Sequence, residues 1–411
     1  MRKIFSALDI GSNTIKLVVG EFTLNKLNIL CAVKVSSYGF KANYITNKDA
    51  LKESIASALE KVSAELNVKI KKVILNIPTS ELEFALTDGV IDIEDEVVQS
   101  NDIVKLLKDV SKNKVSNNNE IICNIPITFK VDDQETTKPF GKNGNKLWVK
   151  SILVSTYKNT VYDLAEAVSS LGLEIIDLTT TGLVDYYNFK NKELDSKNVA
   201  VVNIGSTTTN ISIFSKGIFI NNHVLEDGGF FIDKEIASRF NLKRNETEYL
   251  KEKMARASVL NSSEEESLKV VNKTGEEVII NELELSKITE EKVSNLVKLI
   301  KNNINLLTKK EISYIIITGG LSELKDINLI INNELNKKGR IGNINNLGAR
   351  SNTYSVALGM LLYFNNKLLL RNKDFTSLSE EEINKMCDDA SEEGSTNTLI
   401  SRVVGYFFDN W

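Results

Sequence analysis

Apolar and polar residues alternate along the first 20 positions of the chain in the manner of two β-strands. An apolar run that reaches Leu8 ends in the polar stretch 9–14, DIGSNT, after which Ile15, Leu17 and Val19 resume the alternation. Two alternating runs joined by a short polar turn that contains glycine predict a β-hairpin.

The same pattern recurs at residues 201–213, which read VVNIGSTTTNISI. With an offset of 194 residues the two stretches align, pairing Asp9 with Asn203, Gly11 with Gly205, Ser12 with Ser206, Thr14 with Thr208 and Leu17 with Ile211. Two hairpins with the same turn predict an internal duplication.

A third stretch, residues 314–324, reads YIIITGGLSEL. Its apolar run predicts a buried strand that ends in Gly319 and Gly320 and opens a helix. Paired glycines at such a turn let a flat ring lie directly on the backbone.

The remaining apolar spacing predicts a chain of mixed strands and helices. Further strands are expected at 27–35, 72–77, 82–93 and 173–177, with short strands around Ile121, Phe129 and Val149. Helices are expected at 47–66, 102–110, 161–171, 179–188, within 225–240, and at 245–257, 288–307 and 354–364. Residues 258–281 are polar and predict short strands at most.

At 411 residues the chain is too long for one hydrophobic core and fits two large lobes. A change of texture near residues 80 and 157 indicates a small α+β module inserted into the first lobe. No Pro- or Gly-rich linker marks its edges, so a plain continuation of the lobe stays open. We expect a first lobe at 1–80 and 158–198, the inserted module at 81–157, a second lobe at 199–229 and 301–370, a further subdomain at 230–300, a linker at 371–397 and a terminal helix at 398–411.

Composition excludes several classes of function. The net charge of −4, from 51 basic and 55 acidic residues, offers no basic footprint for nucleic acid. The one histidine, His223, argues against a histidine zinc site or a Ser-His-Asp triad, and Cys31, Cys123 and Cys387 lie too far apart for a disulfide framework. No signal peptide precedes the first strand and no run of 18 apolar residues occurs, so a cytosolic chain that does not span a membrane is expected.

The two hairpin turns carry residue types that suit a phosphate. Gly11 lets the backbone approach a ligand, and successive N–H groups with the Ser12 and Thr14 hydroxyls can form an anion-binding nest. Asp9, at the end of a buried strand, can orient the water shell of a Mg²⁺ ion. A common surface turn has the same composition, and the second copy favours the phosphate-binding interpretation over it.

Two further features of the second half suit a nucleotide. Gly228 and Gly229 precede a predicted helix whose N-terminus can face a phosphate through free N–H groups and the helix dipole. Glu248 and Lys251 lie three residues apart on one face of the next helix, where they can reach ribose hydroxyls and an adenine edge. On spacing alone, a surface ion pair explains the last pair equally well.

The last 41 residues have a composition of their own. Residues 371–397 hold eight acidic and three basic residues with few apolar groups, which predicts a disordered linker with an r.m.s. reach of roughly 30 Å. Beyond it, one helical face gathers the apolar residues Leu399, Ile400, Val403, Val404, Phe407, Phe408 and Trp411. Fourteen residues are too few to span a bilayer but suit a helix lying in the membrane interface. Docking of this helix on a lobe is the alternative.

These stretches together resemble the bacterial cell-division protein family FtsA. The matching segments are SALDIGSNTIKLVVGEF, VDDQETTKPFGKNGNKLWVKSILVST, VVNIGSTTTNISIF, EDGGFFIDKEIA followed by ETEYLK, IIITGGLSEL and RIGNINNLGARSNTYSVALGMLLY. The resemblance implies an α/β fold of the actin, Hsp70 and sugar-kinase superfamily: an actin-like two-lobed ATPase fold with duplicated β-β-β-α-β-α lobes, an inserted α+β subdomain of the 1C type and a C-terminal amphipathic helix.

The resemblance also implies a function. It implies a protein that binds ATP and Mg²⁺, polymerises, and tethers FtsZ filaments to lipid on the cytoplasmic side of the cell membrane at the division site. FtsZ would dock its C-terminal peptide on the subdomain at 230–300. The residues implied in nucleotide binding are Asp9, Gly11, Ser12, Asn13, Thr14, Lys16, Gly205, Ser206, Thr207, Thr208, Gly229, Glu248, Lys251, Gly319, Gly320 and Leu321, with Asp9 also at the metal.

One departure from the family pattern bears on catalysis. The second hairpin of the family opens with Asp-Ile-Gly-Gly-Gly-Thr-Thr-Asp, whereas this chain has Asn203 at the first position. A missing carboxylate removes a charge that would help to hold Mg²⁺ or polarise the attacking water. Hydrolysis is therefore open, and at most a weak ATPase is expected.

Two other functions remain as alternatives. The opening DIGSNTIKLVV is also similar to that of exopolyphosphatases and guanosine pentaphosphate phosphatases, which share this fold. A pilus-assembly scaffold of the PilM type is the other alternative, although neither a terminal membrane helix nor a long acidic tether is expected there.

Overall fold

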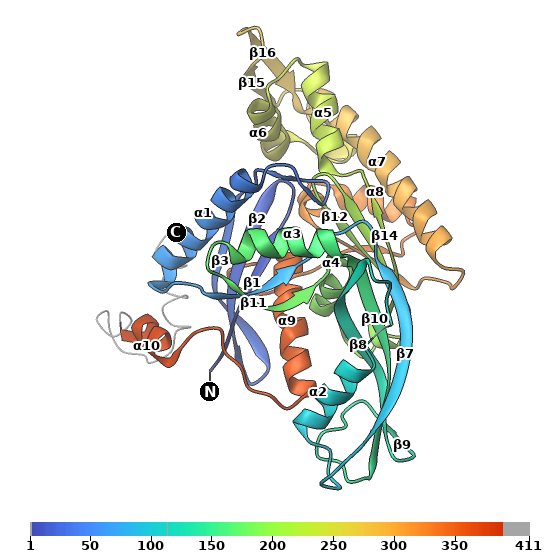
Figure 1. The fold of residues 1–411 in the computed structure, drawn as a ribbon. Coiled ribbons are helices and arrows are strands. Elements are labelled where there is room, and N and C mark those ends of the chain that lie inside the picture. The colour runs from blue at the N-terminus through green and yellow to red at the C-terminus, as the bar shows by residue number, and fades with distance from the viewer. Residues whose placement is uncertain (1, 113, 389–411) are drawn as a thin grey trace. The chain divides into compact units, whose positions relative to one another are not determined.

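The computed structural model describes residues 2–112 and 114–388 (Figure 1). The chain divides into two compact units. Among the described residues, unit 1 comprises 2–188, 345–350 and 356–388, and unit 2 comprises 189–344 and 351–355. Each unit contains one five-stranded sheet.

The sheet of unit 1 has the strand order β11-β6-β1-β2-β3. β1 (Lys3–Ile10), β2 (Thr14–Thr23) and β3 (Lys26–Ser36) pair antiparallel, and β6 (Lys72–Asn76) and β11 (Glu174–Thr179) continue the sheet in parallel. β1 is buried from Ile4 to Ile10, as its apolar run predicts. Helix α1 (Lys48–Leu66) packs on β2 and β3. It begins after Asn47, whose side chain caps the helix by accepting hydrogen bonds from the N–H groups of Asp49 and Ala50.

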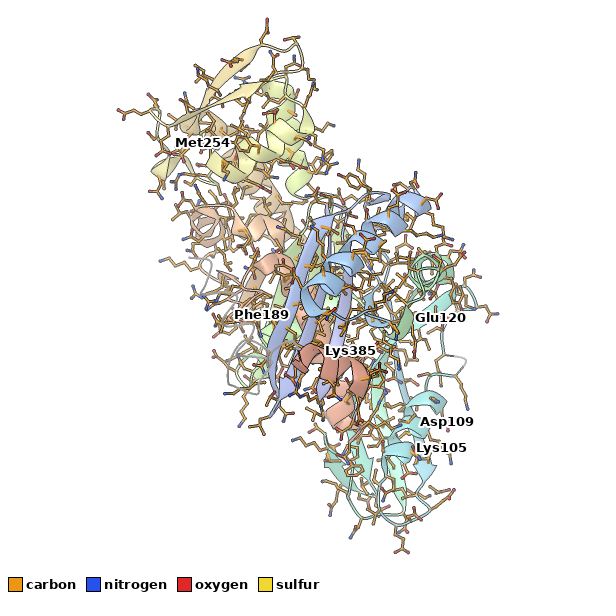
Figure 2. The ribbon with its side chains drawn as sticks, turned by 90° about the vertical axis from the view of Figure 1, so that its left-hand side faces the viewer. Lys105, Asp109, Glu120, Phe189, Met254 and Lys385 are labelled. Carbon is orange, nitrogen blue, oxygen red and sulfur yellow. The ribbon has the colours of Figure 1, made fainter. Side chains whose placement is uncertain are left out.

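The sheet of unit 2 repeats this order as β14-β13-β12-β17-β18. β12 (Asn198–Ile204), β13 (Thr209–Ser215) and β14 (Ile218–Leu225) are antiparallel, and β17 (Tyr314–Thr318) and β18 (Gly339–Ile341) join in parallel. Between β14 and β17 lie α5 (Gly229–Arg239), α6 (Arg244–Met254), the hairpin of β15 (Ser267–Val271) and β16 (Glu277–Asn281), and α7 (Glu282–Leu307). Helix α8 (Ile327–Glu334) connects β17 to β18. Met254, labelled in Figure 2, is buried at the end of α6.

The two sheets share register as well as order. Asp9 lies opposite Lys16 across the first hairpin, and Asn203 lies opposite Asn210 across the second. The backbone N–H at the head of each turn donates to the carbonyl three residues on, at 3.2 Å for Gly11 and 2.9 Å for Gly205. The predicted duplication of the α/β lobe is thus confirmed.

Residues 83–157 of unit 1 form a second, four-stranded sheet in the order β7-β10-β8-β9. Its strands are β7 (Glu83–Asp92), β8 (Asn119–Val131), β9 (Gln134–Thr136) and β10 (Lys146–Tyr157), and helix α2 (Ser100–Asp109) packs on β7 and β10. The prediction of separate strands around Ile121 and Phe129 was wrong, because both lie in the 13-residue β8. The register shifts next to Pro126, so the strand continues past the proline through a bulge.

The segment 179–188, which precedes the second unit, contains less α-helix than predicted. The expected helix at 179–188 is one turn of α-helix, α4 (Thr181–Val184), followed by a 3₁₀ turn at Asp185–Asn188. Helix α3 (Lys158–Ser169) leads into β11 as predicted. After β17 the chain makes a 3₁₀ turn at Gly320–Glu323 where the sequence predicted a helix.

The end of the described chain differs from the prediction. Helix α9 (Ser355–Leu370) was expected in the second lobe, yet residues 356–388 belong to unit 1. The ring of Phe364 packs edge-on against that of Phe5 at 5.0 Å, and Gly359 approaches α4 so closely that a Cβ would lie 2.1 Å from the Val184 carbonyl oxygen. Because helix α9 is almost wholly apolar, it has to be buried. These close contacts show that it packs within unit 1.

The predicted linker is also partly wrong. Residues 371–388 are ordered on unit 1 and include helix α10 (Glu380–Asp388), because Leu378, Ile383 and Met386 are buried there. Residues 389–397 and the predicted membrane helix at 398–411 lie outside the described residues. None of the helices in the described ranges is long and apolar enough to cross a bilayer.

Candidate functional site

The turn of the first hairpin sits between a carboxylate and an ammonium group. Asp9 ends β1 with 6% of its surface exposed, and its Oδ2 accepts a hydrogen bond from the Lys16 Nζ at 3.2 Å. A Cβ added at Gly11 would lie 3.3 Å from that Nζ, so the glycine lets the charged group lie against the turn. The predicted residues Asp9, Gly11 and Lys16 therefore form one cluster.

The end of β6 and the start of α4 complete this cluster. Asn76, at the end of β6, donates from Nδ2 to the Asp9 Oδ1 at 3.2 Å and to the Thr181 Oγ1 at 3.0 Å. Its Oδ1 is buried and has no hydrogen-bond partner in the described part of the chain. A buried acceptor of this kind needs a donor such as water. The donor set of Asp9 and Asn76 thus fits a hydrated Mg²⁺ ion, which keeps most of its waters in proteins.

The described residues contain no group of three or more acidic, histidine or cysteine side chains that could enclose a metal. A Mg²⁺ ion here would therefore depend on one carboxylate, on water and on the oxygens of a ligand such as a phosphate, which is the usual manner of its binding in nucleotide sites.

The segment after β3 braces the first turn. The Ser37 N–H donates to the Asn13 carbonyl oxygen at 2.9 Å, and the Ala42 N–H donates to the Ser12 Oγ at 3.1 Å. Ala42 and Asn43 both have positive φ, at 48° and 69°, in the tight turn between β4 (Phe40–Lys41) and β5 (Tyr44–Ile45). These bonds hold the predicted residues Ser12 and Asn13 in place, with Thr14 beginning β2.

The second turn is packed against the start of α5. The N–H of Gly229 donates to the Gly205 carbonyl oxygen at 3.0 Å, and the N–H of Phe230 donates to that of Ser206 at 2.7 Å. The expectation that the first N–H groups of this helix are free for a phosphate is wrong for these two. Gly228 makes the contact possible, since a Cβ there would lie 2.6 Å from the Gly205 carbonyl oxygen. Thr207 and Thr208 complete the turn.

Gly229 brings four of the predicted residues together. A Cβ at this position would lie within 4 Å of the Gly205 carbonyl oxygen, the Leu321 Cδ1 and the Lys251 Nζ. The Lys251 ammonium pairs with the Asp233 carboxylate at 2.5 Å, with side-chain exposures of 19% and 13%. Glu248 does not join them, because its Oε1 accepts from the Arg244 Nε at 2.8 Å on a more exposed face. Lys251 therefore lies beside the turn. The surface ion pair between Glu248 and Lys251 that spacing allowed was wrong, because Glu248 pairs with Arg244 and Lys251 with Asp233.

Burial raises the pKa of the Asp233 carboxyl above its ordinary value, and the adjacent Lys251 ammonium offsets part of that rise. Burial likewise raises the pKa of Asp227, two residues before α5. An acid with a raised pKa in the folded state binds more protons there than in the unfolded state, so stability falls as the pH rises through that interval.

Replacing Lys251 by methionine is expected to lower the free energy of unfolding by about 2 kcal/mol at pH 7. Without the ammonium the pKa of Asp233 rises further, so the loss should shrink as the pH falls and the carboxyl becomes protonated. Urea unfolding at several pH values measures this. Arg244→Met, which removes the exposed pair with Glu248, should cost less than about 0.5 kcal/mol. Equal losses in the two variants would contradict the buried pair.

The Gly-Gly turn after β17 touches the end of β12. Gly319 has φ +84°, and a Cβ there would lie 2.5 Å from the Ile204 carbonyl oxygen and 2.8 Å from the Asn203 Oδ1. Asn203 also donates from Nδ2 to the Ser355 Oγ at 3.3 Å. Gly320 has more room, with the Thr353 Cγ2 nearest at 3.8 Å, and Leu321 is 6% exposed.

The sequence analysis did not identify three residues of these clusters, Asn76, Thr181 and Asp233, and it named Gly228 without its packing against the second turn. Asn76 had a readable signal, since it is a polar residue at the end of a predicted buried strand, as Asp9 is. Parallel strands place such residues at one edge of the sheet. Asp233 had no such signal, because its partner lies on another helix.

Two family descriptions match the sequence. "Cell division protein FtsA" matches residues 200–359, and "SHS2 domain inserted in FTSA" matches residues 80–155. The chain is 25% identical over 366 residues to the cell division protein FtsA of Bacillus subtilis, covering 88% of this chain and 83% of that one. It is 22% identical over 379 residues to FtsA of Escherichia coli K12, covering 88% and 90%.

Solved structures share the fold at lower identity. The PilM-PilN type IV pilus biogenesis complex aligns with a TM-score of 0.60 at 14% identity, over 87% of this chain and 98% of the other. MreB 5 of Spiroplasma citri bound to AMPPNP aligns with a TM-score of 0.53 at 13% identity, over 89% and 97%. The likeness establishes an actin-like fold with the SHS2 insertion.

Proposed function

Because this chain belongs to the FtsA family of bacterial cell division proteins, we propose that it binds ATP with Mg²⁺, assembles with copies of itself and tethers FtsZ filaments to the cytoplasmic membrane. The observation that carries the nucleotide part is the duplicated hairpin turn, which recurs in both units with the same register and the same internal hydrogen bond.

Unit 1 contributes the groups that suit phosphates and a metal ion. The Lys16 ammonium offers positive charge beside the turn at 11–14, and the turn itself offers backbone N–H groups and hydroxyls. Asp9 and the buried Asn76 Oδ1 would orient the waters of the Mg²⁺ ion. When bound, Mg²⁺ neutralises phosphate charge. The protein groups hold and orient the nucleotide.

Unit 2 contributes the second turn at 205–208, the Lys251 ammonium and the Gly319-Gly320 turn. Lys251 lies next to Gly229, and its ion pair with Asp233 positions the ammonium beside the turn. The glycine pair leaves the backbone bare for a flat ring such as adenine, with Leu321 beside it. Glu248 would reach the ribose only after it leaves Arg244, and this exchange costs little because the pair is exposed.

The second turn lacks a carboxylate that ATP hydrolysis would use. At the position that duplicates Asp9, the chain has Asn203, an uncharged side chain that already donates to Ser355. The proposal is therefore a nucleotide-binding protein with at most weak ATP turnover.

The variant Asp9→Asn is expected to weaken ATP binding in Mg²⁺ about tenfold, since it removes the one carboxylate of the proposed metal site. Binding in EDTA should change little, because the turn and Lys16 stay. Fluorescent-nucleotide titration with and without Mg²⁺ separates the contribution of the metal ion to ATP affinity from that of the turn and Lys16. A variant that retains the full Mg²⁺ effect would remove Asp9 from the metal site.

Membrane and FtsZ binding rest on the sequence and the family. Residues 398–411 supply the amphipathic face, and with Arg402 as its one cation apolar burial must dominate its lipid affinity. A single weak anchor binds reversibly, so attachment gains from assembly of many copies. The segment at 230–300, built from α5 to α7, is where we propose the FtsZ C-terminal peptide docks.

Reconstitution tests this function. FtsZ filaments should sediment with phosphatidylcholine/phosphatidylglycerol vesicles when the full chain and ATP are present, and should stay in solution when the chain ends at Asn397. FtsZ without its C-terminal peptide is the matched control and should not be recruited. Recruitment by the shortened chain would contradict the membrane anchor, and recruitment of FtsZ lacking its peptide would contradict the docking mode.

The phosphatase alternative has one observation in its favour, the similarity of the opening DIGSNTIKLVV. Release of phosphate from polyphosphate or guanosine pentaphosphate by the purified chain would support it. The family descriptions, which cover residues 80–155 and 200–359, favour the cell-division function.

A further inference from the structure

The segment 371–388, which we call the strap, packs against unit 1 near the start of β1. The Ser377 N–H donates to the Ile4 carbonyl oxygen at 2.7 Å, which is a backbone hydrogen bond to β1 near its start. Figure 2 labels Lys385 on helix α10, the last element of the strap. The strap therefore lies at the opposite end of β1 from Asp9, about 17 Å away for a strand of this length.

Aromatic packing holds the first half of the strap. The Phe375 ring stacks on Phe5 with ring centroids 6.4 Å apart and meets Phe364 edge-on at 5.8 Å. The Lys72 Nζ lies 5.6 Å from the centroid of the same ring. Phe5 is itself fully buried, so Phe375 joins an existing aromatic core of unit 1.

The second half of the strap is a capped and anchored helix. Ser379 and Glu382 form a reciprocal capping box at its start, with N–H to side-chain distances of 2.8 and 3.2 Å. Ile383 and Met386 are 9% and 2% exposed. Glu382 also pairs with Lys71 at 2.9 Å, next to the start of β6.

Two acidic residues of the strap form ion pairs with lysines near the starts of β1 and β6. Asp374 pairs with Lys3 at 2.8 Å, as Glu382 does with Lys71. Exposed ion pairs contribute little to stability, so the buried apolar side chains carry the docking and the acidic residues select where it occurs.

Docking of the strap changes the length of chain before the predicted membrane helix. With α10 in place, nine residues, 389–397, connect it to residue 398, instead of the 27 residues of 371–397. Nine residues span at most about 30 Å, whereas 27 residues span up to about 90 Å.

We propose that the strap is a docked connector that brings the C-terminal segment to the end of unit 1 where β1 and β6 begin, so that this end faces the lipid surface at a distance of at most about 30 Å. The lipid part of this inference rests on the proposed membrane function. The docking of the strap itself rests on the contacts of Phe375, Ser377 and α10.

Hydrogen exchange of the full chain in solution tests the docking. The amides of 375–386 should exchange at least about tenfold more slowly than in the variant Phe375→Ser with Ile383→Ser, which removes one apolar contact from each half of the strap. The matched control, Lys373→Ser with Asn384→Ser, changes two exposed residues of the same segment and should keep the protection. Unprotected amides in the wild type would overturn the proposal.

Neutron reflectometry on a supported bilayer of phosphatidylcholine and phosphatidylglycerol tests the distance. The gap between headgroups and protein should be at most about 30 Å for the wild type and the control pair, and wider for Phe375→Ser with Ile383→Ser. An unchanged gap in that variant would overturn the role of the strap in setting the distance. If the wild type binds no lipid but its strap amides exchange slowly, the membrane part of the inference and the proposed membrane anchor are both contradicted. The docking of the strap would still be supported.

Discussion

Replacing Gly319 by valine is expected to destabilise unit 2 by about 3 kcal/mol or more and to abolish ATP binding. The backbone at this position has φ +84°, a conformation that a β-branched residue adopts only with strain. The added Cβ would also lie 2.5 Å from the Ile204 carbonyl oxygen, an atom of the central strand that cannot move away without disturbing the sheet. Urea unfolding and fluorescent-nucleotide titration measure the two effects.

The variant Gly320→Ala separates folding from binding. It changes the neighbouring residue of the same turn, where a Cβ meets its nearest atom at an ordinary 3.8 Å. We expect the free energy of unfolding to stay within about 1 kcal/mol of the wild type. ATP affinity should fall if a nucleotide ring lies on this turn, and unchanged affinity would place the ring elsewhere. A Gly319→Val variant that folds and binds ATP like the wild type would contradict the geometry of the turn.

The double variant Phe407→Glu with Trp411→Glu is expected to lower vesicle binding by roughly 100-fold while leaving ATP affinity unchanged. Both residues belong to the apolar face predicted for residues 398–411, outside the described structure. A carboxylate on that face must either enter the apolar region or lift the helix out of the interface, and either outcome removes most of the binding free energy.

The control for this experiment adds the same charge to the other face. Ser401→Glu with Asn410→Glu introduces two carboxylates on the polar side of the same predicted helix. It should reduce vesicle binding by only a few fold, through repulsion from anionic lipid. Co-sedimentation with phosphatidylcholine/phosphatidylglycerol vesicles measures both variants. Equal losses would show that net charge, and not the apolar face, governs binding.

The duplicated hairpin could be predicted from the sequence because every signal for it is local. Alternation of apolar residues, a short turn and a glycine at its head lie within about 15 residues in each copy. The register found in the two units, with Asp9 opposite Lys16 and Asn203 opposite Asn210, follows directly from that spacing.

The partners of the charged residues could not be predicted in this way. Helical spacing allowed an ion pair between Glu248 and Lys251 as one of two interpretations. Lys251 instead contacts Asp233 of another helix, 18 residues earlier, and Glu248 pairs with Arg244. Asn76 reaches Asp9 across 67 positions of the chain. Such pairs depend on how elements pack, and one sequence records no trace of that choice.

The sequence by itself determined the two α/β lobes, the two phosphate-type turns, the glycine pair after β17 and the loss of a carboxylate at Asn203, because periodicity and turn chemistry act between near neighbours. The tertiary structure decided which unit takes helix α9, and that residues 371–388 are docked and not a free linker. Composition marked this segment as polar, but a few apolar side chains order it against unit 1, among them Phe375, Leu378, Ile383 and Met386. Their burial against a preformed surface offsets the conformational entropy lost when the segment becomes ordered. An isolated segment has no such surface.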